Sequence, residues 1–346
     1  MGPDSIAVEL IAVALAVAAV VLLALRWDAG RGRRRTTLRA AAATLCVATT
    51  AAVALLWVNR QVETYTTWSD VFGGPTEANA SGSVPAAPAD THIQGRIVTL
   101  TVPGRDSGMT APMYVYLPVA YDRKPARRFP VIEALDGFPG SPLTWLHRLG
   151  AADHLDREIA AGRMAPTVVL FPYQTPDPLL DTECTNLRYG PKAETFLTVD
   201  VPATARAHLR VRTDRAAWGL IGYSAGGYCA TNLLLRHPTR YAAAASLSGY
   251  SDPGIAIGDG TEHTLNNDIW RLQHLPPPAV ALYLACARTD PTAMRDTAAL
   301  ARAAHPPVST TTAYVGTGGH NSQTWQAMEA PAFDWLSGWL ARALPS

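Results

Sequence analysis

The residues best suited to chemistry are Gly222-Tyr223-Ser224-Ala225-Gly226, a G-x-S-x-G pattern. The run before it, 216–221, is short and apolar and predicts a buried strand. The run after it carries three consecutive leucines and stops at Pro238, as a helix does. A serine on a glycine-flanked turn between a strand and a helix is a nucleophile elbow, so we predict that Ser224 attacks an acyl carbon.

A serine hydroxyl needs a general base, and the best candidate is His320. It follows a β-rich run and the glycines 316, 318 and 319, which places it on a loop past the carboxyl end of a strand, where catalytic groups of α/β sheets collect. The remaining histidines after Ser224 fit a helix end or a polar surface better; they are His237, His263, His274 and His305.

An acid must orient the base, and Asp290 is the preferred residue because it follows the strand-like run 279–287. Asp252, which follows an earlier strand, is the second choice. Asp296 lies inside the next expected helix and is weaker. Asp290 is also compatible with a purely structural role at a helix N-terminus ahead of Pro291.

The oxyanion that forms during acyl transfer needs two backbone N–H donors. Ala225 follows the nucleophile and supplies one. Phe138, in the loop Asp136-Gly137-Phe138-Pro139-Gly140, is the expected second donor because Pro139 has no N–H. Asp136, Tyr223 and Trp325 are candidates for substrate contact, with a plain turn role equally open for Asp136.

Eight strand-like runs alternate with helical stretches after an initial hairpin, which predicts an α/β three-layer sandwich with a mostly parallel eight-stranded sheet. The segment 251–278 is long and polar, and we expect it to cap the site. The expected strands are 96–102, 113–118, 129–135, 167–171, 216–222, 241–247, 279–287 and 310–315, and the expected helices are 143–161, 194–209, 225–236, 292–304 and 323–343.

The first sixty residues predict a membrane anchor. Residues 6–25 contain one charge, Glu9, and residues 40–58 contain none, so each segment is long enough to cross a bilayer. Six arginines and one aspartate lie between them, which by the positive-inside rule makes the connecting loop cytoplasmic and the rest of the chain extracytoplasmic. The second segment, rich in Ala and Thr, could instead be a weakly inserted or packed helix.

The chain therefore divides into a two-helix anchor (1–60), an extracytoplasmic linker (61–94) rich in Pro, Gly and Ser, and a catalytic domain (95–346). We expect a multi-pass protein of the plasma membrane. A net charge of +1 gives no indication of nucleic-acid binding, and no metal or cofactor motif is present, so the predicted mechanism needs none.

Four cysteines fit this organisation. Cys46 lies in the second apolar segment and Cys286 in a buried strand, where each behaves as a small apolar side chain. An oxidising exterior would favour a disulfide between Cys184 and Cys229, which would hold a loop beside the serine, although the sequence leaves open whether the two meet.

Four motifs resemble the esterase D and antigen 85 group of α/β-hydrolases, which contains serine esterases and mycolyltransferases. They are Leu135-Asp136-Gly137-Phe138, Ala193-Glu194-Thr195-Phe196-Leu197, the Gly222–Gly227 turn and Gly318-Gly319-His320-Asn321. The resemblance covers roughly 94–344 and implies the triad Ser224, Asp290 and His320 with oxyanion donors Phe138 and Ala225. Ala225 stands where the family often has Met, which leaves a backbone donor unchanged.

The sequence thus predicts an extracytoplasmic, membrane-anchored serine esterase acting on a small-molecule or lipid ester. A second hypothesis is an acyltransferase, similar to the mycolyltransferases, that moves an acyl chain onto an envelope sugar or lipid, although the chain shows no recognisable trehalose-binding residues. The same triad is compatible with a peptidase, and the fold by itself is compatible with a catalytically inactive envelope binding protein.

Overall fold

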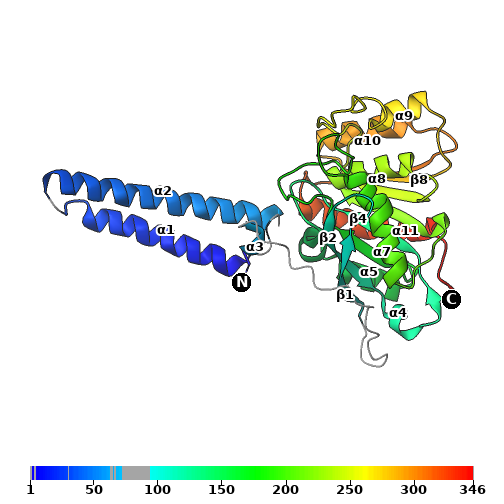
Figure 1. Ribbon diagram of the computed structural model, residues 1–346, viewed down its shortest axis with the longest axis horizontal. Helices are drawn as coiled ribbons and strands as arrows, with labels where there is room; N and C mark the ends of the chain where they lie inside the picture. Colours follow the sequence, from blue (N-terminus) through cyan, green and yellow to red (C-terminus); the bar gives the residue numbers. More distant parts are fainter. Residues whose placement is uncertain are drawn as a thin grey trace. The chain divides into compact units, whose positions relative to one another are not determined.

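The computed structural model describes residues 2–3, 5–29, 31–62, 65, 68–71 and 94–345. The chain forms two compact units, Met1–Thr76 and Glu77–Ser346 (Figure 1). Most of the expected linker, 61–94, lies outside the described residues. Each unit is described by itself.

The N-terminal unit is a pair of long helices, α1 (Ile6–Arg26) and α2 (Gly32–Val62), with a short third helix, α3 (Trp68–Val71). Ser5 caps α1 by accepting the Ala7 N–H. Glu9 of α1 pairs with Arg60 of α2. Because α2 begins at Gly32, most of the arginines expected in a loop lie in its first turns, where Asp28 pairs with Arg35 and Arg39.

Both long helices could cross a membrane by length and composition. Their apolar side chains face outward: within the unit Leu10, Leu15, Val47 and Leu55 are exposed. Exposed apolar side chains therefore extend along both long helices of this unit.

The second unit is built on an eight-stranded sheet with the strand order β1-β2-β5-β4-β6-β7-β8-β9. β1 and β2 form an antiparallel hairpin, β2 pairs antiparallel with β5, and every later pairing is parallel. The predicted sandwich with a mostly parallel sheet is confirmed. The strands are β1 (Arg96–Pro103), β2 (Thr110–Leu117), β4 (Val131–Leu135), β5 (Val168–Pro172), β6 (Trp218–Tyr223), β7 (Ala243–Leu247), β8 (Ala281–Ala287) and β9 (Ser309–Val315).

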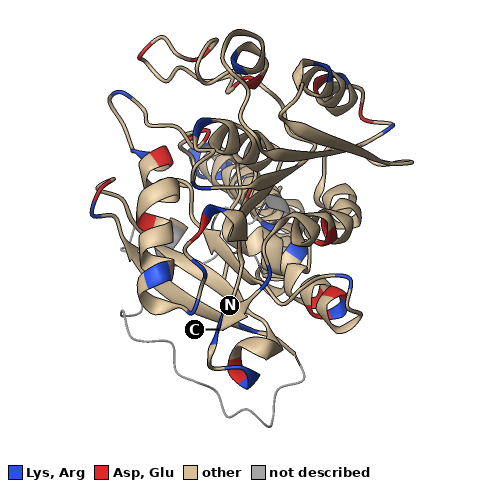
Figure 2. Cartoon of the chain, turned by 90° about the vertical axis from the view of Figure 1, so that its right-hand side faces the viewer, with Lys and Arg blue, Asp and Glu red and all other residues tan. Residues whose placement is uncertain are grey.

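Helices cover both faces of this sheet and create two separate cores. One core gathers around Phe196, Leu220 and Leu233, and the other around Trp145, Ile221 and Phe333. Charged residues lie mainly on the helices and loops, while the strands carry few (Figure 2). The main helices are α5 (Ala151–Ala160), α7 (Val201–His208), α8 (Ala225–Arg236), α9 (Asp268–His274), α10 (Pro291–Ala303) and α11 (Ser322–Trp339).

Smaller elements complete the unit. They are α4 (Val119–Arg123), the two-residue strands β3 (Arg127–Arg128) and β10 (Leu344–Pro345), the π-helical turns Thr144–Arg148 and Phe196–Asp200, α6 (Ala193–Thr195), and the 3₁₀ turn Arg215–Ala217. The strands β3 and β10 pair with each other and bring Leu344 and Pro345 next to the segment that precedes β4.

The segment 251–278 packs on the side of α8. Asp268, the first residue of α9, accepts hydrogen bonds from Thr231 and Asn232, and Tyr228 donates to the Asn266 carbonyl. None of the residues that line the hollow beside Ser224 comes from this segment. These side chains satisfy buried polar groups of α8. Whether the segment caps the site stays a prediction.

Candidate active site

Ser224 lies at the tight turn between β6 and α8. Its φ of 54° and ψ of −122° are a strained conformation for a residue with a side chain. The turn closes tightly: a Cβ on Gly226 would lie 2.2 Å from the Leu135 carbonyl oxygen. The Ser224 N–H donates to the Leu247 carbonyl at 3.0 Å, which fixes the turn on β7. Strain and close packing thus present the hydroxyl at the carboxyl edge of the sheet.

His320 meets this hydroxyl directly. Its Nε2 lies 2.7 Å from the Ser224 Oγ, within hydrogen-bond distance for proton transfer. The imidazole side chain is about half exposed, at 47 %. The structure therefore brings together the serine and the histidine that the sequence favours among five downstream candidates.

Asp290 lies on the far side of the imidazole and is buried. Its Oδ2 is 3.5 Å from His320 Nδ1, longer than an ordinary hydrogen bond but close enough for strong attraction to an imidazolium. Its Oδ1 accepts the Ala293 N–H at 3.1 Å and so caps α10. The position of Asp290 is compatible with both roles that the sequence leaves open, because each carboxylate oxygen faces a different partner.

The two remaining acid candidates, Asp252 and Asp296, are engaged elsewhere. Asp252 accepts from His263 at 2.9 Å and from Asn267. Asp296 lies beside Arg295 on the exposed side of α10. Neither is paired with His320.

Two threonines that the sequence analysis missed hold the loop that carries His320. The Thr289 hydroxyl donates to the Gly318 carbonyl at 2.6 Å and accepts the Gly318 N–H at 2.9 Å. Thr324 accepts the Gly319 N–H at 3.0 Å, and Asn321 caps α11. A threonine directly before the expected acid is the only sequence signal that could have pointed to this support.

Tyr223 and Trp325, predicted as substrate contacts, lie underneath the imidazole. Trp325 meets the His320 ring edge-on at a centroid distance of 5.1 Å and stacks on Tyr223 at 4.6 Å. Both side chains are buried, and neither is among the residues that line the hollow beside Ser224. Their position supports the base from below.

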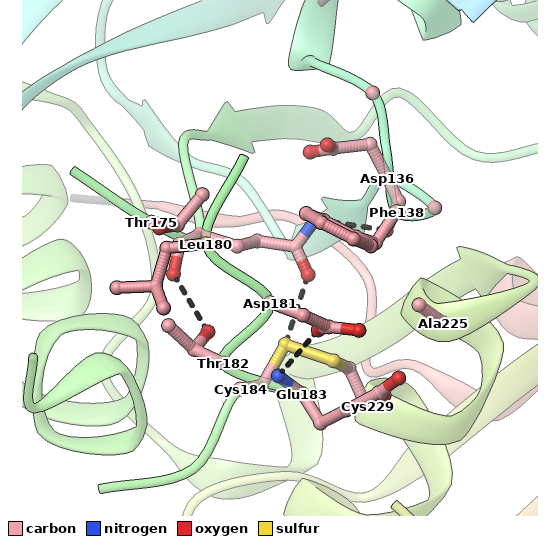
Figure 3. Close-up of a pocket in the computed structure, with 13 residues that line it drawn as sticks. Asp136, Phe138, Thr175, Leu180, Asp181, Thr182, Glu183, Cys184, Ala225 and Cys229 are labelled. Atoms are coloured by element: carbon pink, nitrogen blue, oxygen red, sulfur yellow. Dashed lines mark hydrogen bonds between the residues drawn. A yellow bond between two sulfur atoms is a disulfide. The ribbon is translucent and has the colours of Figure 1, made fainter. Parts of the chain in front are cut away.

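The loop after β4 packs against the nucleophile turn. A Cβ on Gly137 would lie 3.1 Å from the Ser224 Cβ and 2.8 Å from the Tyr223 ring, so only glycine permits this approach. Phe138 and Ala225, the expected oxyanion donors, line the same small hollow (Figure 3).

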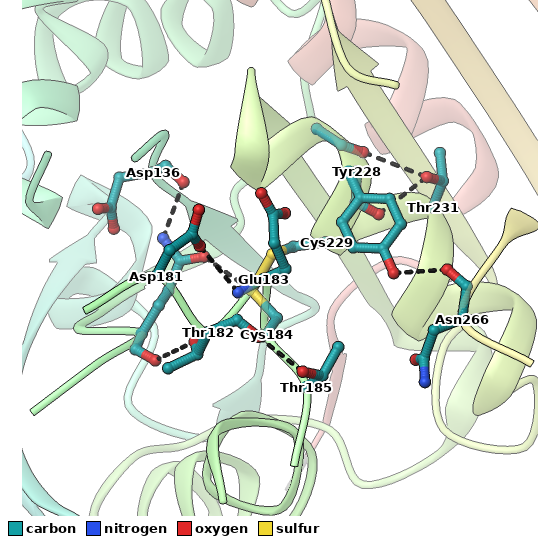
Figure 4. Close-up of a disulfide and its surroundings, with 12 residues drawn as sticks. Asp136, Asp181, Thr182, Glu183, Cys184, Thr185, Tyr228, Cys229, Thr231 and Asn266 are labelled. Atoms are coloured by element: carbon teal, nitrogen blue, oxygen red, sulfur yellow. Dashed lines mark hydrogen bonds between the residues drawn. A yellow bond between two sulfur atoms is a disulfide. The ribbon is translucent and has the colours of Figure 1, made fainter. Parts of the chain in front are cut away.

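The opposite side of this hollow is the loop 174–184, which a disulfide ties to α8. Cys184 is bonded to Cys229, so the pairing that the sequence leaves open is formed in the structure (Figure 4). Glu183 and Cys184 both have positive φ, 43° and 53°, which is uncommon for residues with side chains. The cross-link holds this strained loop against the helix that follows Ser224.

Three carboxyl groups face the hollow: Asp136, Asp181 and Glu183. Burial raises the pKa of Asp136 to about 7, and burial together with the nearby Asp181 raises the pKa of Glu183 to about 9. Burial also raises the pKa of Asp181. Such shifts in a concave site beside a nucleophile are typical of functional groups. Among the described residues, no cluster of three or more metal-ligating side chains occurs.

Comparison with known proteins identifies the family of the chain. A model of the family described as "Putative esterase" matches residues 107–338. An uncharacterized protein of Corynebacterium glutamicum is 24 % identical over 343 residues, covering 91 % of this chain and 78 % of that protein.

Solved structures share the fold. A ferulic acid esterase superposes with a TM-score of 0.61 at 21 % identity, covering 72 % of this chain and 99 % of its own. An S-formylglutathione hydrolase from Agrobacterium tumefaciens gives a TM-score of 0.60 at 14 % identity, covering 73 % and 98 %. A fluorophosphonate-binding serine hydrolase from Staphylococcus aureus gives 0.56 at 17 %, covering 70 % and 99 %. At these identities the structures establish the fold.

Proposed function

The chain belongs to the esterase family whose model spans residues 107–338, as a serine ester hydrolase of the α/β-hydrolase fold, and from this premise we propose that Ser224, His320 and Asp290 are its catalytic triad. The substrate is a carboxylic ester. The observation that carries the assignment is the 2.7 Å contact between Ser224 Oγ and His320 Nε2 on a strained, outward-facing turn.

The reaction proceeds through an acyl-enzyme. His320 Nε2 removes the hydroxyl proton while Ser224 Oγ forms a bond to the carbonyl carbon, and the imidazolium then gives that proton to the departing alcohol. Asp290 stabilises the imidazolium across 3.5 Å. A water molecule then attacks the acyl carbon while His320 Nε2 takes its proton. The imidazolium returns that proton to Ser224 Oγ as the carboxylic acid leaves.

The oxyanion is held by the N–H groups of Phe138 and Ala225. The close packing of Gly137 on the Ser224 turn supports this role, because it brings the two backbone segments together. Loss of one such donor costs about 3 kcal/mol of transition-state stabilisation.

We further propose that residues 1–60 anchor the enzyme in the plasma membrane through α1 and α2, that 61–94 is an extracytoplasmic linker, and that 95–346 acts outside the cytoplasm. Two observations support this: both helices carry exposed apolar surface, and a disulfide fixes a loop of the catalytic domain. Structural disulfides persist in oxidising compartments.

The test uses the full-length chain in detergent micelles. A fluorophosphonate probe labels the wild-type protein and fails to label Ser224→Ala, and p-nitrophenyl esters are turned over only by the former. Asp252→Asn is the matched control, because that acid pairs with His263, and it retains labelling. A folded wild-type protein that resists the probe contradicts the triad and favours the inactive binding protein. Release of p-nitrophenol that speeds up when alcohols or sugars are added, with transfer products, would favour the acyltransferase.

A further inference from the structure

The hollow beside Ser224 has an uncompensated acidic lining. Asp136, Asp181 and Glu183 contribute three carboxyl groups, and none of the described residues that line it is a lysine, arginine or histidine. By contrast, Glu194, a buried acid elsewhere in this unit, pairs with Arg236 and His237. Ala225, which lines the hollow, directly follows Ser224, so the acids lie close to the proposed nucleophile.

Two of these carboxyls keep an oxygen unused. Asp136 Oδ1 and Glu183 Oε2 are buried and have no hydrogen-bond partner. The two residues as a whole are only 6 % and 4 % exposed. The second Glu183 oxygen accepts from the Tyr250 hydroxyl. A buried polar atom without a partner costs free energy, so a ligand that satisfies these oxygens would recover it.

The lining is held in place by the rest of the site. Asp136 precedes Gly137, which packs on Ser224, and Glu183 precedes Cys184, which is bonded to α8. Figure 3 shows Asp136 and Phe138 across the hollow from the disulfide, with Ala225 at its side. A group bound between the two acids would therefore lie next to the expected oxyanion donors.

We propose that this hollow binds a positively charged ammonium group carried by the substrate, so that the preferred substrates are cationic esters. The inference rests on the proposed function, since it names the substrate class for the same serine. An organic ammonium group fits better than a metal ion, because the described residues offer no metal-ligating cluster there. Burial favours the protonated carboxyls in the empty hollow, and an ammonium group bound between them favours their ionised forms, so that binding the cation releases protons to solvent.

Isosteric ester pairs test the proposal on the full-length enzyme. The alcohol side is probed with butyrylcholine and 3,3-dimethylbutyl butyrate, which differ by a nitrogen cation in place of a carbon. The acyl side is probed with the ethyl esters of 4-(trimethylammonio)butyric acid and 5,5-dimethylhexanoic acid. We expect kcat/KM for the cationic member of at least one pair to exceed that of the neutral member about tenfold or more.

Substitutions connect that preference to the hollow. Glu183→Gln and Asp136→Asn are nearly isosteric and should each lower the cationic-to-neutral ratio severalfold. Asp153→Asn, which removes an exposed carboxyl on α5, is the matched control and should keep the wild-type ratio. Tetramethylammonium chloride should slow fluorophosphonate labelling of the wild type more than sodium chloride at equal ionic strength, and this protection should be lost in Glu183→Gln.

The outcomes separate the two proposals. Labelling and neutral-ester turnover without a cation preference in either pair overturn the ammonium site and leave the esterase intact. A preference that survives both substitutions also overturns it, since the charge would then be recognised elsewhere. Absence of labelling and of all turnover overturns the proposed function itself.

Discussion

Single polar side chains outside any catalytic motif determine where the base lies. His320 is on an exposed loop with little apolar packing of its own, so its position depends on the Thr289 hydroxyl, which bonds both the N–H and the C=O of Gly318. The rings of Trp325 and Tyr223 support it from beneath. These contacts hold the His320 side chain in place as firmly as a helix or strand would.

Replacement of Thr289 by Val should therefore impair catalysis. The change preserves shape but removes both hydrogen bonds to Gly318, and we expect kcat to fall about tenfold or more while KM changes little. Thr289→Ser keeps the hydroxyl and should restore most of the rate. Steady-state kinetics with a p-nitrophenyl ester measures both variants; an unchanged kcat in Thr289→Val would show that the loop needs no such support.

Glu133 illustrates a different residue-scale effect, on stability. It is fully buried in β4, where its Oε2 accepts from the Tyr241 hydroxyl at 3.1 Å, and burial raises its pKa to about 8. The folded state therefore holds a proton that the unfolded state releases above its ordinary pKa of 4.5. Stability must fall as pH rises from that ordinary value towards 8.

Glu133→Gln removes this titration while it keeps an amide oxygen for Tyr241. We expect the variant to be more stable than the wild type at pH 8, by about 1–3 kcal/mol, with a smaller difference at pH 5. Thermal or urea unfolding at both pH values measures it. A constant difference between the two curves across this range would contradict the assignment.

At the scale of elements, local pattern predicts most of the sheet. All eight strands are predicted within a few residues, and the helix after Ser224 is predicted as Ala225–Arg236, because apolar runs and Pro238 define these elements locally. The pairing of β3 with β10 is missed, because Leu344 meets Arg128 only through the folded chain. The contacts of 251–278 with α8 are missed for the same reason, because the surface that a polar segment covers depends on its buried partners.

The candidate site, like the fold, has parts that local sequence predicts and parts that depend on contacts between distant residues. Ser224 and His320 are predictable because motif and loop glycines mark them, and their contact follows from the parallel strand order. The acidic hollow is not, since Glu183 lies in a loop without secondary structure. Only the expected cross-link at Cys184 points towards it, and the side-chain oxygens that lack partners are visible only in three dimensions.

The disulfide should stabilise the loop that carries Glu183. It closes 45 residues, and a cross-link of that length contributes roughly 2–4 kcal/mol. We expect a Cys184→Ala/Cys229→Ala variant to be less stable by that amount, to unfold at a lower temperature and to lose the cationic preference. Cys286→Ala is the control, since that free thiol is far from the loop in sequence and should leave the cationic preference unchanged. An unaltered melting curve in the double variant would contradict a structural role.

For the whole molecule, the important feature is the contrast between two units with different surfaces. The N-terminal pair exposes apolar side chains along both helices, whereas the second unit buries its apolar residues in two cores. A chain of this kind suits the boundary between a bilayer and water. In the proposed topology, the arginines at the start of α2 hold the connecting turn on the cytoplasmic side.

Fusion reporters test this topology. Alkaline phosphatase, which folds only outside the cytoplasm, should be active when joined after Ser346 and inactive when joined after Arg31. Green fluorescent protein at the same positions should give the reverse pattern. Substitution of Arg33, Arg34 and Arg35 by Gln should weaken the asymmetry. Phosphatase activity at Arg31 in the unsubstituted chain would place the catalytic unit in the cytoplasm.

The position of His320 late in the chain has a consequence for biosynthesis. Ser224, the loop after β4 and the strands that hold them are made first, whereas β9, the histidine loop and α11 are made last. The base reaches the serine only after β9 has paired with β8 and α11 has packed beneath the sheet. In the proposed mechanism a growing polypeptide therefore carries an unactivated serine until α11 has left the ribosome, and ester cleavage begins only after that point.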